Sequence, residues 1–95
     1  MVPGFNRNFL YRGERFHLQV EDCGVKTARI ETQLFKDGMV ICGRKYSYQD
    51  IVSSENINEI VAELIKEQGK AMLRSLQKGE FDEILSKMAV STEGM

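Results

Sequence analysis

The residues that could hold a metal ion are few in this chain and lie far apart. The side chains of ligand type are His17, Asp22, Cys23 and Cys42. A structural zinc site needs a tetrahedral set of ligands, and in sequence these usually come as close pairs such as CxxC or HxxxH. Neither spacing occurs here, so we expect no metal site and interpret both cysteines as free thiols.

Acid–base and thiol chemistry have little support in the spacing. Glu21 and Asp22 are adjacent carboxylates next to an expected turn, where Asp22 accepts hydrogen bonds from the turn backbone. A thiol nucleophile needs a base such as histidine beside it. An active site would have to gather His17, Glu21 and Cys42 in one deep pocket, and no motif predicts that. We therefore expect a protein that is not an enzyme and that uses no cofactor.

Two arginines on either side of an expected turn, Arg12 and Arg15, could bind an anionic group. His17 and Gln19 follow them along the chain, so these four residues form a candidate ligand face for a small molecule or nucleotide. No glycine-rich phosphate loop between a strand and a helix accompanies them. Small-ligand or nucleotide binding is therefore the alternative function.

Length and charge limit the function classes further. A chain of 95 residues supports one hydrophobic core, so we expect a single domain over residues 1–95. The 13 Lys and Arg residues and 14 Asp and Glu residues give a formal net charge of −1, so no global positive field would attract nucleic acid or an anionic membrane. No apolar run approaches the roughly 20 residues of a membrane helix, and the arginine-bearing start lacks the apolar part of a secretory signal. We expect a cytoplasmic protein that binds neither nucleic acid nor membrane.

Residues 1–50 predict an antiparallel β-meander of three to four strands. Apolar and polar residues alternate over residues 15–21 and again over 26–35, which is typical of half-buried strands. Segments 5–11 and 39–46 are expected to flank these two strands. The apolar face should lie in the core. The opposite face is polar and consists of His17, Gln19, Glu21, Arg29, Glu31 and Gln33.

The hairpin around Asp37-Gly38 sets the register of the last strand. An Asp-Gly pair tolerates the positive φ angles of a two-residue hairpin loop. Such a loop is expected to pair Leu34 with Ile41 as a core contact, and Glu31 with Arg44 as an ion pair. A three-residue loop with a bulge at Gly38 would shift this register by one. We favour the two-residue loop.

Residues 54–88 predict helices, which makes the expected fold α+β: a β-meander followed by a long α-helix and a short C-terminal helix. Apolar residues recur every three or four positions from Ile57 to Leu76. Ser54 or Asn56 could cap the long helix, and Lys78-Gly79 is typical of its end. Gly69 lies inside it, where glycine either permits close packing or is simply tolerated.

The surface of the long helix is acidic in its first half and basic in its second. This distribution matches the helix dipole, and it also allows two copies to pair antiparallel with acid opposite base. We expect a protein–protein interface or a homodimer on this surface. The candidate interaction residues are Ile60, Leu64, Glu63, Glu67, Lys70 and Arg74.

Three segments carry a resemblance to a known group. The run Asn8–Gly13, the run His17–Gly24 and the residues from Thr32 through Gly38 resemble the opening of small uncharacterised bacterial proteins with an N-terminal β-meander and a helical C-terminus. The resemblance covers about the first half of the chain and residues 73–85. It implies an α+β protein of bacteria and assigns no activity to any residue. We expect an interaction or regulatory module whose partner uses the long helix or the exposed edge of the sheet.

Overall fold

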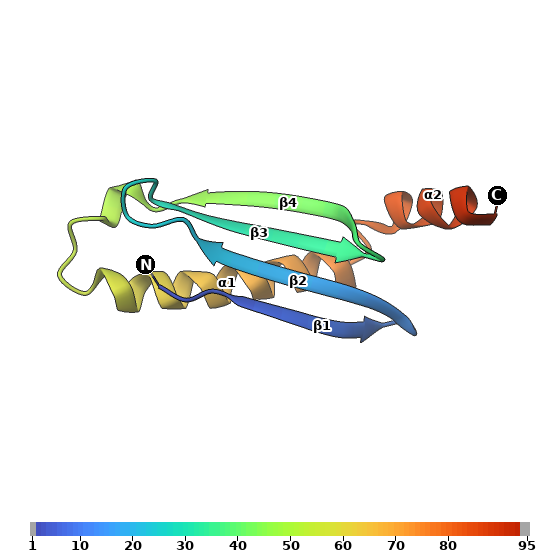
Figure 1. The fold of residues 1–95 in the computed structure, drawn as a ribbon, viewed down its shortest axis with the longest axis horizontal. Helices are drawn as coiled ribbons and strands as arrows, with labels where there is room; N and C mark the ends of the chain where they lie inside the picture. The colour runs from blue at the N-terminus through green and yellow to red at the C-terminus, as the bar shows by residue number, and fades with distance from the viewer. Residues whose placement is uncertain (1, 94–95) are drawn as a thin grey trace.

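Four antiparallel strands in chain order are followed by two helices, so the fold is α+β as the sequence predicts (Figure 1). The computed structural model describes residues 2–93, with side chains described through Met88. The elements are β1 (Phe5–Tyr11), β2 (Glu14–Asp22), β3 (Arg29–Lys36), β4 (Met39–Ser47), the 3-10 turn η1 (Gln49–Ile51), α1 (Ile57–Gln77) and α2 (Asp82–Glu93).

The core lies between α1 and one face of the sheet. Side chains that the alternation places on that face are buried, with Leu18, Val20 and Ile30 almost fully covered. α1 packs on them through its buried residues, which are Val61, Ile65, Gly69, Met72, Ser75 and Leu76. Burying one large apolar side chain stabilises the fold by roughly 1.5–3 kcal/mol. The side chains predicted for the polar face point away from α1; they are His17, Gln19, Glu21, Arg29, Glu31 and Gln33. Asp22, Thr32 and Lys36 are polar as well but are buried on the helix side.

Gly69 allows α1 to pack closely against the sheet. A Cβ atom at this position would lie 2.8 Å from Cζ of Phe5 and 3.5 Å from a methyl group of Val20. The glycine lowers helix propensity by about 1 kcal/mol relative to alanine. Its place in the structure supports the close-packing interpretation over simple tolerance.

The ends of α1 agree with the sequence only in part. Asn56 is the N-cap residue, but its side chain makes no capping hydrogen bond, so the capping interaction expected there is absent. The C-terminal end is as predicted: the amide of Lys78 donates to the carbonyl of Arg74 at 2.9 Å, and Gly79 has a φ of +82°. This positive φ is the conformation that glycine adopts without strain.

The predicted start of the third strand is wrong. β3 begins at Arg29, not at Lys26, because the preceding residues form a turn in which Ala28 has a φ of +52°. The amide of Ala28 donates to the carbonyl of Gly24 at 2.8 Å, and the amide of Tyr48 donates to the carbonyl of Ala28 at 2.8 Å. The turn therefore connects β2, β3 and the end of β4.

The register of β4 corrects the sequence prediction. The two-residue Asp37-Gly38 loop is confirmed, since Lys36 pairs with Met39 and both loop residues have positive φ. A bulge then follows between Leu34 and Phe35, where β4 contains one residue more than β3. Leu34 consequently pairs with Cys42 and not with Ile41, and Glu31 pairs with Lys45 and not with Arg44.

The bulge decides on which face Arg44 lies. Ile41 is the extra residue and is buried, while Arg44 pairs with Thr32 on the helix side of the sheet. There its Nη2 donates to Oγ of Ser75 at 2.8 Å, and the guanidinium lies over the ring of Phe81 at 5.7 Å. Arg44 therefore connects β4 to the end of α1 and to the segment before α2.

Asp22 joins three parts of the chain at the end of the sheet opposite the β1–β2 and β3–β4 turns. Its carboxylate accepts hydrogen bonds from the hydroxyl of Tyr48 at 2.5 Å, the amide of Val2 at 2.9 Å and the amide of Gly24 at 3.0 Å. Burial alone would raise the pKa of Asp22, but these three donors hold it below its usual value. Burial and the contact with Asp22 raise the pKa of Tyr48. The hydrogen bond to the turn backbone was expected, whereas the bonds from Tyr48 and Val2 were not.

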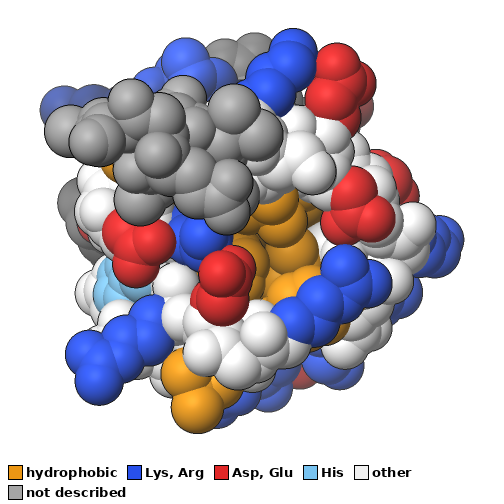
Figure 2. Space-filling model, turned by 90° about the vertical axis from the view of Figure 1, so that its right-hand side faces the viewer, with side chains coloured by type: hydrophobic (Ala, Val, Ile, Leu, Met, Phe, Trp, Pro, Cys, Tyr) orange, Lys and Arg blue, Asp and Glu red, His pale blue; other side chains and the backbone are white. Residues whose placement is uncertain are grey.

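The molecule is elongated, measuring 53 × 20 × 20 Å with a radius of gyration of 15.3 Å. A compact chain of this length would have a radius of about 12 Å. The difference reflects α2, which extends beyond the hairpin tips (Figure 1) and contacts the core through Leu85 and Met88. Seen from this end, apolar side chains line a hollow between charged ones (Figure 2).

Neither helix of the described chain combines enough length and apolar character to cross a bilayer.

We predict that Arg44→Met lowers the free energy of unfolding by about 1–2 kcal/mol, because the buried Ser75 loses its charged partner. Lys45→Met is the matched control, since Lys45 lies on the exposed face, and it should change stability by less than about 0.5 kcal/mol. Urea unfolding of both variants measures the difference. Equal losses in the two variants would contradict the bulged register.

We predict that Asp22→Asn makes stability less sensitive to acid. The pKa of Asp22 is lowered in the folded state, so its contribution is present above the unfolded value of about 4 and is lost as pH falls through the folded value. The variant should unfold more easily at pH 7 by about 1–2 kcal/mol and should lose less stability below pH 4. Urea unfolding between pH 7 and pH 2.5 tests this, and parallel curves for the two proteins would refute it.

Candidate functional site

The face of the sheet turned away from α1 is the candidate functional site, and we call it the open face. No other element of the described chain packs across it (Figure 1). Antiparallel partners point to the same side of a sheet, so the side chains of the open face form rows across the strands. Each row combines residues that are far apart in the sequence.

The ring row contains Asn8, His17, Phe35 and Val40, one from each strand. The rings of His17 and Phe35 lie 5.7 Å apart between centroids and are tilted. Nδ1 of His17 lies 2.8 Å from Oδ1 of Asn8, a carbonyl oxygen, so Nδ1 donates this hydrogen bond and neutral His17 keeps Nε2 as an acceptor. Apolar side chains remain in water beside this pair: Val40 is 52% exposed, and Leu10 on β1 is 69% exposed.

A shallow groove of about 500 Å³ opens beside the ring row. Its lining residues are Asn8, Arg15, Phe16, His17, Gln19, Phe35, Asp37 and Gly38. Three of the four residues predicted as a ligand face, Arg15, His17 and Gln19, therefore do come together. Arg15 has no ion-pair partner within the described residues, so its guanidinium is available to a ligand.

Arg12 does not join this groove, which corrects the predicted ligand face. It lies in the β1–β2 turn with a φ of +53°, and its guanidinium lies 5.0 Å from the centre of the Tyr11 ring. An ion pair of 3.8 Å connects it to Asp82 at the start of α2. Arg12 therefore contacts the end of the molecule where α2 begins. The turn geometry that moves it there depends on the positive φ, which residue type alone did not indicate.

The amide row is the next row and contains Asn6, Gln19, Gln33 and Gly43. Side-chain amides both donate and accept, so they can hydrogen-bond to a peptide backbone or to another amide. Nε2 of Gln19 donates to Oε1 of Glu21 at 2.9 Å. Gly43 ends the row with open space above it, and a hollow of about 360 Å³ lies between Gln33 and Lys45. The row thus provides hydrogen-bonding groups beside a recess.

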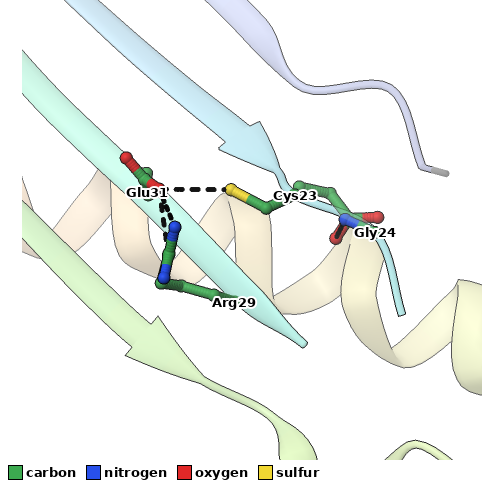
Figure 3. A network of polar contacts seen from close by, with 5 residues as sticks. Cys23, Gly24, Arg29 and Glu31 are labelled. Carbon is green, nitrogen blue, oxygen red and sulfur yellow. Dashed lines mark hydrogen bonds and ion pairs between the residues drawn. The ribbon is translucent and has the colours of Figure 1, made fainter. Parts of the chain in front are cut away.

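At the charged end of the open face, Arg29 and Glu31 neutralise each other in an ion pair. Nε and Nη2 of Arg29 bind Oε2 of Glu31 at 2.9 and 2.8 Å, and Sγ of Cys23 donates to the same oxygen at 3.4 Å (Figure 3). The bond from Arg29 lowers the pKa of Glu31, helped by the thiol. Burial and then the bond to Glu31 raise the pKa of the Cys23 thiol. Cys23 is therefore kept in the thiol form, which is a poor nucleophile.

The groups that catalysis would need are not brought together. His17 and Glu21 lie on the open face, whereas Cys42 pairs with Leu34 on the helix side and packs against the core. Both cysteines are free. Among the described residues, no three His, Cys, Asp or Glu side chains lie close enough to hold a metal ion.

The candidate interaction residues on α1 divide into two groups. Leu64 packs against the core and Ile60 is half-buried, so neither forms an exposed apolar patch. The charged members, which are Glu63, Glu67, Lys70 and Arg74, are exposed. Nζ of Lys66 forms an exposed ion pair of 3.6 Å with Glu63. Self-association of two α1 helices through these charged residues stays a prediction.

Comparison of the chain with protein-family models, with curated protein sequences and with solved structures finds no match. The function is therefore inferred from the geometry of the chain's own residues.

Proposed function

We propose that this protein is a non-enzymatic binding module that holds a partner protein on its open face. The observation that carries the proposal is the ring row with its groove. The tilted rings of His17 and Phe35 lie beside this groove, and exposed Leu10 and Val40 lie near them. Aromatic and apolar side chains surrounded by polar ones are typical of the centre of protein interfaces.

The charges of the open face favour a protein over a polyanion. Arg15 and Lys45 are its available cations, because Arg29 is held by Glu31. Glu21 is a further anion of the same face, so the surface is close to neutral. A nucleic acid or anionic membrane would need several free cations along its path. The amide row instead offers donors and acceptors that suit a peptide backbone.

The local chemistry supports binding without catalysis. The carboxylate of Asp22 is buried under three donors, Glu31 is paired with Arg29, and Cys23 is held as a thiol. His17 is oriented by the amide of Asn8 and not by a carboxylate, unlike the histidine of a catalytic triad. The two free thiols suit a reducing compartment, and we infer the bacterial cytoplasm from this together with the resemblance.

A second candidate function is binding of a small anionic ligand in the groove beside His17. The observation that favours it is the convergence of Arg15, His17 and Gln19 on one groove of about 500 Å³. This volume falls in the range of small-molecule sites, roughly 300–1,000 Å³. The groove is shallow, so it would bury less of a small ligand than a closed pocket does.

We predict that a photo-crosslinking amino acid in place of Gln33 yields a defined product with a partner protein in the cells that make this protein. Gln33 lies in the amide row of the open face. The same probe in place of Gln49, an exposed glutamine outside the open face, is the control and should give no such product. Adding His17→Ala to the Gln33 probe should lower the yield about tenfold, because an interface anchor is lost.

Equal crosslinking from both positions, or none from Gln33, would contradict the proposal. A product with twice the mass of the chain would assign the open face to a second copy of the same protein, and this too would overturn a foreign partner at that site.

We predict for the second candidate that an anionic ligand raises the melting temperature only when the groove is intact. A panel of nucleotides and dicarboxylates at millimolar concentration would be screened by thermal shift. A ligand at about 100 times its Kd stabilises the folded state by about 2.7 kcal/mol, which is a shift of several degrees for this chain. The shift should vanish in Arg15→Ala and persist in Arg12→Ala, which lies outside the groove. Absence of any shift would leave only the protein-binding proposal.

A further inference from the structure

A second recessed surface lies on the other side of the sheet, between β1 and α1. We call it the edge groove. It encloses about 320 Å³, and its floor is apolar, formed by Phe5, Leu18 and Leu73. Its rim is basic, formed by Arg7 from β1 and by Lys66 and Lys70 from α1. An apolar floor with three cations around it selects for an occupant that is both apolar and acidic.

The cations of the rim are available to such an occupant. Arg7 and Lys70 are exposed and have no ion-pair partner within the described part of the chain. Lys66 pairs only with Glu63, at 3.6 Å, and both side chains are more than 60% exposed. An exposed ion pair of this kind contributes less than about 1 kcal/mol and is easily exchanged for another carboxylate.

The edge groove runs beside an unpaired strand edge. β1 is the first strand of the sheet and pairs only with β2. Alternate residues along its seven-residue length therefore point backbone N–H and C=O groups to the outside. In the described chain no other backbone segment hydrogen-bonds to this edge. An extended peptide can continue the sheet here, and half of its side chains would then face the edge groove.

The charges of the rim also oppose the simplest alternative occupant, a second copy of this chain. Pairing β1 of one copy with β1 of another would bring two sets of Arg7, Lys66 and Lys70 together around one axis. Like charges that face each other across an interface repel, so the rim opposes self-pairing. A nucleic acid strand could meet the cations, but its phosphate backbone offers no amide groups to continue the sheet.

We propose that the edge groove binds an acidic, extended segment of a partner protein, which adds to the sheet along β1. Carboxylates of the segment meet Arg7 and Lys70, and an apolar side chain between them covers Phe5 and Leu73. The site lies on the opposite side of β1 from the open face and does not depend on what the open face binds.

The probe for this proposal is the synthetic seven-residue peptide Thr-Glu-Thr-Val-Thr-Glu-Thr. In an extended conformation, its two glutamates and its valine lie on one face. Binding to the full chain is measured by isothermal titration and by amide chemical shifts of 15N-labelled protein. We expect a dissociation constant below about 1 mM, as for short peptides held by strand addition, with the largest shifts on β1. The same peptide methylated on its backbone nitrogens cannot pair with the strand edge and should bind at least about tenfold more weakly.

Charge reversal tests the rim. The variant Arg7→Glu with Lys70→Glu should lose the acidic peptide by about tenfold or more, and it should gain affinity for a peptide with lysine in place of glutamate. The matched control, Lys26→Glu with Lys78→Glu, makes the same change in net charge at exposed positions outside the edge groove and should bind as the parent chain does.

Four outcomes would overturn the proposal. They are no binding up to several millimolar, equal binding of the methylated peptide, equal loss in the control variant, and tighter binding of a single-stranded oligonucleotide that competes with the peptide. Circular dichroism of each variant confirms that the fold is kept, which is expected because all four substituted side chains are exposed.

Discussion

One helix can cover only one face of a four-stranded sheet, and the rest of this structure follows from that constraint. α1 lies over β2 and β3, with Gly69 removing the side chain that would keep it at a distance from Phe5 and Val20. The close contact makes the helix side a dry core. Within residues 2–93 no element covers the opposite side, so its residues must be stable in water while they remain arranged by the same strands. This is why the rings, amides and charges of the open face stand in ordered rows.

Much of the fold could be predicted because alternation and helical periodicity are local signals. The buried face of Phe16, Leu18 and Val20, the Asp37-Gly38 loop and the end of α1 at Lys78-Gly79 all depend on residues close together in the sequence. The register of β4 could not be predicted in the same way. Period-two reasoning assumes that both strands contribute equal numbers of residues, and a bulge breaks that assumption. The side chain of Ile41 is apolar in either register, so its type gives no warning.

The candidate site was predictable only where it lies along one strand. Arg15, His17 and Gln19 alternate on β2, and the structure keeps them together in one groove. The ring row was not predicted, because Phe35 and Val40 belong to other strands than His17 and only the strand pairing brings them beside it. The sheet edge and Lys70 were predicted as interaction sites, but the edge groove between them was not, because Arg7 and Lys66 are far apart in the sequence and only the packing of α1 makes them neighbours. Sequence separation, more than residue type, limited the prediction.

The bulge at Ile41 also determines how readily this surface could change. Because Ile41 is an extra residue, every later residue of β4 is shifted by one position relative to β3. Deletion of that single residue would therefore exchange the two faces of the strand. Arg44 would move into water and Lys45 into the layer beneath α1, with no substitution at either position. A one-residue length change in a hairpin can thus turn an arginine that binds the helix into an exposed surface charge. In this fold, variation in loop and strand length can alter binding properties as strongly as variation in the side chains themselves.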